Sequence, residues 1–468
     1  MRLPLLLGLV AAAGQAAADQ EAVAHHFPDD PLFGHQWPLS NTGQGGRVAG
    51  ADVGATEAWA YTRGSPDIVI AVLDDGVQLD HPDLAPNLAG AGLDFTVHPP
   101  GGDGGPRASR DRHGTSVAGI AAARGDNGIG ISGMCPRCTI LPLRIDKAPT
   151  AGTAAAIRYA VEQGASIIVN SWGYAHEESA AATADAAVRD AIEFAAHHGR
   201  DGRGALIVFA VTNEPVDNCG GPRADIASLD SVLAVGVADH NDRVGGSGFG
   251  DCVDVVAPSK PRDRTTIGVT TTDRTGLDGH SPGDYDARFG GTSAAAPLVA
   301  GIAGLLLSMN TELSRTDLQR ILEHTAEKID ADFAAYDAAG FSRRAGHGRV
   351  SAARALVPTV TISVQPSRVR AGEPFSVSVR ASAPFGLASV SWFGVDTGLE
   401  DFDRPRVRAA AGQAIHSVTW NGIVIDRMGT YTLGADAVDT RHPGAEGDRY
   451  PHRASDAAGA ATAEITVR

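Results

Sequence analysis

Apolar runs of strand length alternate with helical patterns over the first three quarters of the chain. The runs 68–73, 140–145, 167–169, 206–211 and 232–237 contain almost no polar residues, as expected for strands that are buried on both faces. Helical patterns lie between and after them, at 115–123, 152–163, 180–197 and 314–324. This alternation predicts an α/β fold with a doubly wound parallel sheet, which binds ligands at the carboxyl ends of its strands.

The pattern changes after Val357-Pro358, where apolar and polar residues begin to alternate with period two. The alternating runs are 359–364, 375–380, 388–392, 415–420, 431–437 and 460–467. Turn residues separate these runs, so we expect a small antiparallel β-sandwich in residues 358–468. The Asp- and Gly-rich interval 439–459 would form a long loop, either ordered by an ion or simply solvated.

Composition and charge narrow the function classes. The 468 residues are 43% hydrophobic and 20% charged, which is typical of a globular chain with more than one domain. The formal net charge is −16 and there is no block of Lys and Arg, so we do not expect nucleic acid as a partner.

The amino terminus has the three regions of a secretory signal peptide. Met1-Arg2 precedes an apolar run at 3–10 and a small-residue run at 11–18, with cleavage expected after Ala18. Residues 19–29 would then form a short exposed leader. No other segment reaches the roughly 18 apolar residues of a spanning helix, so we expect no membrane span and a secreted or periplasmic protein.

The chain has four cysteines, an even number that favours two disulfides in an exported protein. Cys135 and Cys138 could close locally, which leaves Cys219 to pair with Cys252. The same C-x-x-C could be a redox centre or half of a zinc site, although the surrounding pattern of a thioredoxin and a second C-x-x-C are both missing.

One serine lies between glycines and a long small-residue helix. Gly290-Gly291-Thr292-Ser293 leads into 294–307, and Pro297 favours the first turn of a helix that begins near Thr292 or Ser293. Ser293 would then lie at the positive end of the helix dipole, where a nucleophilic oxygen is favoured. Taken alone, such a serine is more often a helix N-cap.

A carboxylate and a histidine elsewhere in the chain are the other two residue types of a serine-based catalytic triad. Asp74 ends the apolar run 68–73, and His113 precedes an Ala- and Gly-rich helix. Each residue alone has a structural explanation, as a turn acid or a core histidine. Together with Ser293 they follow one of the known orders of an Asp-His-Ser triad.

These blocks resemble the subtilisin-like serine proteases over about residues 30–356. The resemblance rests on Leu73-Asp74-Asp75-Gly76, His113-Gly114-Thr115 and Gly291-Thr292-Ser293 with the residues up to Pro297. The Leu-Asp-Asp-Gly form, Asp30-Pro31-Leu32-Phe33 and Ser171-Trp172-Gly173 are most similar to the kexin branch. The resemblance implies a subtilisin-like peptidase domain at 30–357.

The resemblance also assigns roles. Ser293 would be the nucleophile, His113 the general base, and Asp74 the carboxylate that orients the imidazole. Asn213 would donate its amide to the oxyanion, although it could also be a turn residue. The family usually has glycine before this asparagine and nearby after it, whereas this chain has Thr212, Glu214 and Pro215.

Substrate contacts are implied less completely. Ser171, Trp172 and Gly173 match the segment whose backbone pairs with an extended polypeptide substrate. Asp75 matches an acid that lines a pocket for basic residues. Tyr174-Ala175-His176 stands where the kexin branch carries acids of its principal pocket, and Glu177 and Glu178 could substitute. We expect a preference for basic residues before the cut.

A calcium site is implied by the same resemblance. The polar loop 125–131 supplies the hard oxygen ligands that Ca²⁺ prefers. The expected ligands are carbonyl oxygens of Arg124, Ile129 and Ile131 and side chains of Asn127, Asp83 and Asp30. A plain glycine turn is the alternative. Asp217 and Asp251, near the second cysteine pair, suggest surface charge rather than another ion.

Most relatives carry a propeptide of tens of residues that assists folding, but only about a dozen residues separate Ala18 from Asp30. We therefore expect a catalytic domain that folds unaided or with a separate chaperone or inhibitor protein.

The sequence thus predicts a secreted, calcium-stabilised serine endopeptidase acting on polypeptides. The carboxyl-terminal module would be a jelly-roll or immunoglobulin-like domain. A catalytically inert scaffold used for adhesion or binding, and a thiol-disulfide oxidoreductase centred on Cys135 and Cys138, are the alternatives.

Overall fold

The structure is a computed structural model of the 468-residue chain. It describes residues 25–146, 150–173, 186–220, 226–262, 267–356, 359–382, 387–395, 406–408, 415–424, 429–439 and 462–467. The expected signal peptide, the leader up to residue 24, Glu177, Glu178 and most of the interval 439–459 lie outside the described residues.

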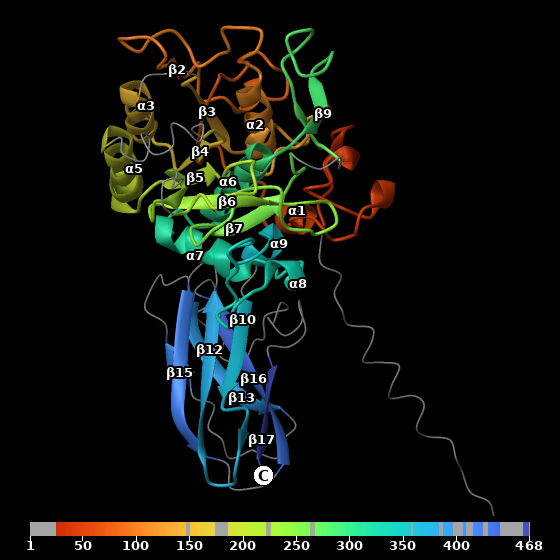
Figure 1. The fold of residues 1–468 in the computed structure, drawn as a ribbon, viewed down its shortest axis with the longest axis vertical. Helices are drawn as coiled ribbons and strands as arrows, with labels where there is room; N and C mark the ends of the chain where they lie inside the picture. The colour runs from red at the N-terminus through yellow and green to blue at the C-terminus, as the bar shows by residue number, and fades with distance from the viewer. Residues whose placement is uncertain are drawn as a thin grey trace, which may run out of the picture.

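A seven-stranded parallel sheet forms the centre of the first part of the chain (Figure 1). Its strand order is β2-β3-β1-β4-β5-β6-β7. The strands are β1 (Val69–Asp74), β2 (Leu93–Asp94), β3 (Thr139–Arg144), β4 (Ile167–Asn170), β5 (Leu206–Ala210), β6 (Val232–Ala238) and β7 (Val255–Pro258). The expected doubly wound α/β fold is therefore confirmed.

Helices cover both faces of this sheet, and the side chains of β1 show why. Ile70 and Val72 belong to the core that contains α2 and α6, whereas Ala71 and Leu73 belong to the core that contains α3 and α5. The helices are α1 (Ala55–Trp59), α2 (His113–Ala122), α3 (Thr150–Glu162), α5 (Ala186–His198), α6 (Thr292–Met309), α7 (Arg315–Thr325), α8 (Ala331–Ala334) and α9 (Ala352–Leu356). Short 3-10 helices occur at Phe33–His35, Gln44–Gly46, Ala85–Asn87, Arg200–Gly202 and Ile226–Ser228. Because successive strand residues point to opposite faces, an uninterrupted apolar run supplies both cores.

Helix α6 is long and apolar enough to cross a membrane by length and composition, the one such helix in the described part of the chain. Its most apolar window is 89% buried inside the protein, as in the core helix of a soluble domain. The helix begins at Thr292, as predicted, but Pro297 is its sixth residue and so lies beyond the first turn.

An antiparallel hairpin of β8 (Val269–Thr272) and β9 (Tyr285–Phe289) leads to α6, and the hydrophobic pattern does not predict it. The three threonines of β8 are buried. Thr271 and Thr272 donate their hydroxyls to the carbonyls of Ser116 and Thr115 on α2, both at 2.7 Å. A strand with buried but hydrogen-bonded threonines lacks the apolar run that the prediction requires.

The carboxyl-terminal residues form two facing sheets, seen at the lower end of Figure 1. One has the order β10-β12-β15 and the other β11-β17-β16-β13-β14. The strands are β10 (Thr359–Gln365), β11 (Arg368–Val369), β12 (Pro374–Ser382), β13 (Leu387–Val395), β14 (Arg406–Arg408), β15 (Ile415–Val424), β16 (Gly429–Asp439) and β17 (Thr462–Val467). Phe375, Val377, Val379 and Leu433 are buried. All pairs are antiparallel except β11 with β17.

Candidate active site

Asp74 and His113 meet at the carboxyl end of β1. Asp74 is the last residue of the strand and is 5% exposed, and His113 is the first residue of α2. The imidazole Nδ1 lies 2.8 Å from Asp74 Oδ1 and 3.0 Å from Oδ2. Because an ionised carboxylate only accepts, Nδ1 carries the proton and Nε2 is left as the basic nitrogen.

Gly114 allows this close approach of helix and strand. A Cβ atom at Gly114 would lie 2.6 Å from the Gly76 carbonyl oxygen and 2.8 Å from the Asp74 Cβ. No larger residue fits there without moving Asp74, which gives the His-Gly pair a physical reason.

Ser293 is the second residue of α6 and is 8% exposed. The N-cap is Gly291, so the interpretation of Ser293 as an N-cap is wrong. In this structure the Ser293 hydroxyl donates to the Ser171 carbonyl at 3.2 Å, and the Ser171 hydroxyl donates to the Ser293 carbonyl at 3.1 Å. That carbonyl lacks its helical partner because Pro297, four residues later, has no N–H.

Asn213 is held beside Ser293 by the residue that precedes the serine. Thr292 donates its backbone N–H to Asn213 Oδ1 at 2.8 Å and its hydroxyl to the same oxygen at 3.2 Å. The amide NH2 group therefore points away from Thr292 and has no partner among the described residues. Close approach is possible because Gly291 has no Cβ, which would lie 2.5 Å from Asn213 Oδ1.

The residues that replace the expected glycines around Asn213 form a hydrogen-bonded turn. Glu214 donates its N–H to the Thr212 hydroxyl at 3.3 Å, and Val216 donates to the Glu214 carbonyl at 2.8 Å. Glu214 and Pro215 are exposed. The turn thus keeps Asn213 at Thr292 without a glycine on either side of it.

Asp75, expected to contact substrate, accepts hydrogen bonds from the start of α2 in this structure. Its Oδ2 accepts the backbone N–H groups of Arg112 at 2.9 Å and His113 at 3.0 Å, and its Oδ1 accepts that of Gly114 at 2.7 Å. These are N–H groups that no residue within a helix can satisfy.

The charges around His113 shift its pKa. Burial lowers the pKa of the imidazole, but the adjacent Asp74 carboxylate and the nearby Asp75 outweigh burial and raise it to about 8. Burial, followed by the negative charge of Asp74, raises the pKa of Asp75 to about 7. The pair of carboxylates therefore favours a positive imidazole, the charge state that a general base passes through.

The segment expected to bind substrate begins beside Ser293. Ser171 directly contacts Ser293, and Trp172 packs against Phe209 with ring centroids 4.9 Å apart. Gly173 is exposed, and the residues that follow it, 174–185, are outside the described part. Phe289, at the end of β9, lies 5.3 Å from the His113 ring.

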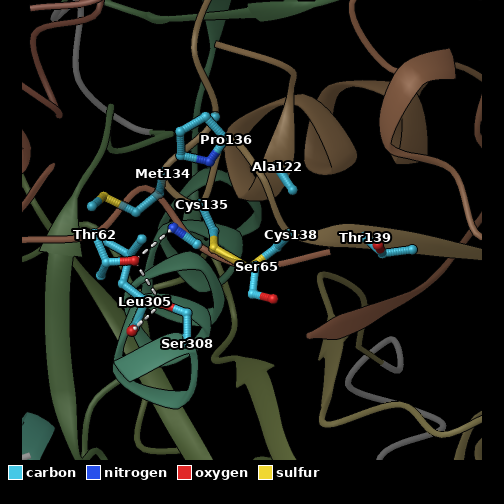
Figure 2. Close-up of a disulfide and its surroundings, with 12 residues drawn as sticks. Thr62, Ser65, Ala122, Met134, Cys135, Pro136, Cys138, Thr139, Leu305 and Ser308 are labelled. Carbon is cyan, nitrogen blue, oxygen red and sulfur yellow. Dashed lines mark hydrogen bonds between the residues drawn. A yellow bond between two sulfur atoms is a disulfide. The ribbon is translucent and has the colours of Figure 1, made fainter. Parts of the chain in front are cut away.

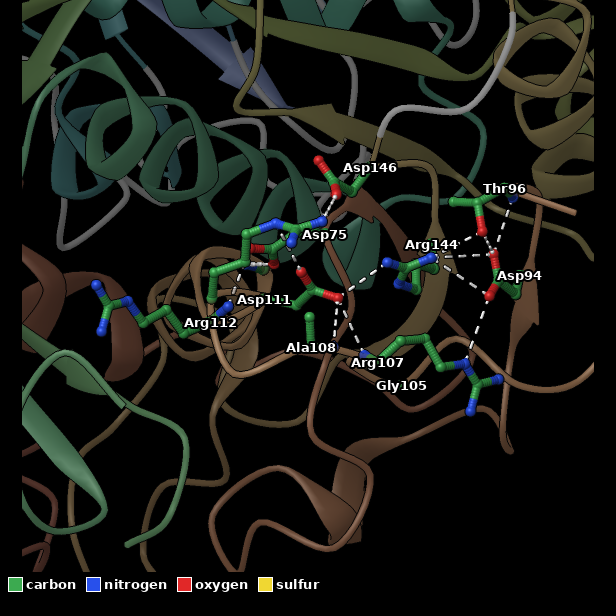
Figure 3. A network of polar contacts seen from close by, with 12 residues as sticks. Asp75, Asp94, Thr96, Gly105, Arg107, Ala108, Asp111, Arg112, Arg144 and Asp146 are labelled. Carbon is green, nitrogen blue, oxygen red and sulfur yellow. Dashed lines mark hydrogen bonds and ion pairs between the residues drawn. The ribbon is translucent and has the colours of Figure 1, made fainter. Parts of the chain in front are cut away.

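A network of charged side chains forms hydrogen bonds and ion pairs with the segment that precedes His113 (Figure 3). Arg144 pairs with Asp74 in the register of β3 and β1 and is 6% exposed. Its guanidinium contacts Asp111 at 2.9 Å and Asp94 at 3.4 Å. Asp111 also accepts the N–H groups of Arg107 and Ala108. No local sequence signal predicts this network, because its members are brought together by the sheet.

Comparison with known proteins identifies the family. The family model described as "Subtilase family" matches residues 65–348, more than half of the chain. The chain belongs to the subtilase family.

Individual relatives agree with this assignment. A calcium-dependent protease of Trichormus variabilis is 32% identical over 379 residues, which cover 74% of this chain and 54% of the relative. Kexin of Saccharomyces cerevisiae is 31% identical over 346 residues, covering 69% of this chain and 39% of kexin. The chain thus spans about half the length of the calcium-dependent protease.

A solved structure shares the fold over most of both chains. The serine protease of Aeromonas sobria, in its complex with the chaperone ORF2, aligns with a TM-score of 0.62 and 20% identity. The alignment covers 87% of this chain and 90% of that chain. At this identity the likeness is evidence of the fold.

Three of the expected calcium ligands of this subtilase, the side chains of Asp30, Asp83 and Asn127, come together around the loop 124–131. Asp30 and Asp83 are 4% and 0% exposed, and neither forms an ion pair with any described residue. Asp30 accepts the N–H groups of Asp126 and Asn127, and Asp83 accepts those of Ile131 and the Asn127 amide. Burial, and the nearby Asp83, raise the pKa of Asp30 to about 6.

Two buried carboxylates that form no ion pair in the described part of the chain fit a bound cation, and oxygen donors of this kind fit Ca²⁺. The described residues contain no group of three or more His, Cys, Asp or Glu side chains that could hold a metal. Main-chain carbonyls, as expected at Arg124, Ile129 and Ile131, would have to complete the ligand set.

The cysteines form the two favoured pairs, Cys135 with Cys138 and Cys219 with Cys252. Figure 2 shows the first disulfide packed beside Leu305 of α6. Both of its cysteines are 0% exposed, and a Cβ at Gly304 would meet a sulfur at 2.9 Å. This disulfide packs against the part of α6 that is distant from Ser293, and because it is buried a thiol of another protein cannot reach it.

Asp217 and Asp251 are bridged by an arginine. Arg343 Nη2 lies 2.6 Å from Asp217 and its Nε lies 2.7 Å from Asp251. The guanidinium supplies the positive charge there, so these acids need no metal ion.

Proposed function

We propose that this subtilase is a secreted serine endopeptidase in which Asp74, His113 and Ser293 form the catalytic triad. The observation that carries the proposal is the hydrogen bond of 2.8 Å from His113 Nδ1 to Asp74, which leaves Nε2 as a base at the edge of the sheet where α6 begins. The kexin and calcium-dependent protease relatives support a protease.

In the proposed reaction His113 Nε2 takes the proton of the Ser293 hydroxyl as its oxygen attacks the substrate carbonyl carbon. For this step the hydroxyl must turn from the Ser171 carbonyl toward the imidazole, a rotation about one side-chain bond. The resulting oxyanion would accept a hydrogen bond from the free Asn213 amide, whose orientation Thr292 fixes.

Collapse of the tetrahedral intermediate expels the amine, which takes the proton from His113, and leaves an acyl-enzyme on Ser293. Water, activated by the same imidazole, then releases the acid and restores the hydroxyl. Asp74 stabilises the imidazolium at both stages without itself taking the proton.

The experiment uses a serine-directed fluorophosphonate, which should label the wild-type protein and not Ser293→Ala. A thermal melt of both proteins controls for folding. Absence of labelling in folded wild type would favour the inert adhesion scaffold. An insulin-reducing activity that survives Ser293→Ala would favour the oxidoreductase, which the burial of Cys135 and Cys138 opposes.

Calcium is proposed as a structural cofactor. Asp30, Asp83 and Asn127, with carbonyls of the loop 124–131, would hold it, as the names of the calcium-dependent relatives also suggest. Bound there, the ion would neutralise the buried carboxylates and stabilise the loop; it takes no part in peptide cleavage.

Export, a folding partner and basic specificity complete the proposal. The two disulfides support an extracytoplasmic location, secreted or periplasmic.

The chaperone named with the Aeromonas protease supports a separate folding partner for this chain. If the enzyme expressed alone were soluble and fully active, no such partner would be needed. Cuts mapped on a mixed peptide library test the preference for Lys and Arg, which the kexin relative supports.

A further inference from the structure

Asp75 follows Asp74 at the end of β1, and together they hold the catalytic histidine in two ways. Asp74 binds the imidazole, and Asp75 binds the backbone of the same residue at 3.0 Å. One strand end therefore fixes both the ring and the main chain of His113.

In the described part of the chain, the start of α2 has no other cap. Its N-cap residue, Arg112, makes no side-chain hydrogen bond to the helix, and the first turn contains no acidic residue. Asp75 takes this place from a different element, since its two oxygens accept three successive N–H groups, at 2.7 to 3.0 Å. A carboxylate at a helix N-terminus is favoured by the hydrogen bonds and by the helix dipole.

The segment that leads into α2 is also held by Asp111, which contacts Arg144. Figure 3 shows Asp75 bonded at Arg112 and Asp111 bonded to Arg144. Arg144 is the partner of Asp74 on the adjacent strand. The ends of β1 and β3 thus hold the residues on both sides of the bond between Asp111 and Arg112, and the position of His113 follows from the sheet.

We propose that Asp75 is a positioning residue for His113, and that its three backbone hydrogen bonds, rather than contact with a basic substrate residue, are its contribution to cleavage. The inference rests on the proposed function. A carboxylate that already accepts three N–H groups has little acceptor capacity left for a cationic side chain. A preference of the enzyme for basic residues before the cut would then not depend on Asp75.

The test compares Asp75→Ala and Asp75→Asn with wild type on two peptides that are identical except for Lys or Ala at a position before the cut. We expect Asp75→Ala to lower kcat by about 10²-fold, with a small change in KM, because misplacing a catalytic group by about 1 Å has effects of this size. The loss should be the same for both peptides.

Asp75→Asn keeps one acceptor oxygen and should recover part of the lost kcat. It also removes a negative charge that faces His113, so the acid limb of its kcat/KM profile should move to lower pH. The other charged or titratable groups around this imidazole, Asp74, Arg112 and His280, are unchanged. Asp80→Asn, which removes an exposed acid from the same segment, is the matched control and should behave as wild type.

A loss confined to the Lys peptide, a change in KM alone, or full activity of Asp75→Asn with an unshifted acid limb would each overturn the inference. If Asp75→Ala does not fold, Asp75→Asn decides alone. Failure of wild type to cleave either peptide or to react with a fluorophosphonate would count against the proposed function instead, so the two failures are separable.

Discussion

Two pairs of acidic residues, Asp74 with Asp75 and Asp30 with Asp83, lie at opposite extremes of charge compensation. The first pair is neutralised by the protein itself, through the His113 imidazole and the positive end of α2. The second pair accepts hydrogen bonds from the backbone and from Asn127 but forms no ion pair with any described residue.

The proposed roles of the two pairs account for the difference. A carboxylate that stabilises a transient positive charge needs a partner that can gain and lose a proton, and imidazole is such a partner near neutral pH. A charge that only has to be buried needs a permanent counter-ion. The Arg343 bridge between Asp217 and Asp251 shows that this chain can supply such a counter-ion from a side chain where the site is exposed.

The substitution Asp74→Asn, in the first pair, has the largest expected effect on activity. It leaves the volume unchanged but removes the acceptor that fixes the imidazole tautomer, so kcat should fall by about 10⁴-fold, while the melting temperature changes little. Steady-state kinetics on a peptide substrate and a thermal melt measure the two quantities. If Asp74→Asn were as active as the control Asp80→Asn, Asp74 would not orient His113.

Removal of calcium tests the other pair. A chelator should lower the melting temperature by several degrees, since a ligand at about 100 times its Kd contributes about 2.7 kcal/mol to stability. The response should be absent in Asp83→Asn and should persist in Asp217→Asn, whose partner is Arg343. A wild-type melt that is the same with calcium and with chelator contradicts the calcium site.

The fold positions of Asp74, His113 and Ser293 could be predicted from the sequence, whereas their contacts could not. Each residue lies in a short motif at the end of a strand or the start of a helix, which local pattern and order indicate. The cap supplied by Asp75, the anchoring of Asn213 by Thr292 and the contact of Arg144 with Asp111 join residues 33 to 79 positions apart. Such contacts depend on how the sheet is assembled, which periodicity does not encode.

The strands outside the main pattern were missed for a related reason. β2 has only two residues, and β8 and β9 contain threonines and charged residues that are satisfied by tertiary hydrogen bonds. Hydrophobic periodicity identifies a strand that is buried by apolar contact, and not one whose polar groups are paired by another element.

The smallest expected effect is a shift of the pH profile of kcat/KM, which tests how the first pair acts on His113. Burial alone would lower the His113 pKa, but Asp74 and Asp75 raise it to about 8 in the free enzyme. Since the base must be neutral, kcat/KM should rise about tenfold per pH unit below that value and level off above it. The measurement needs a peptide without a group that titrates between about pH 6 and 9. An acid limb centred at the ordinary histidine value of about 6.5 would mean that the two carboxylates do not act on the imidazole as this geometry requires.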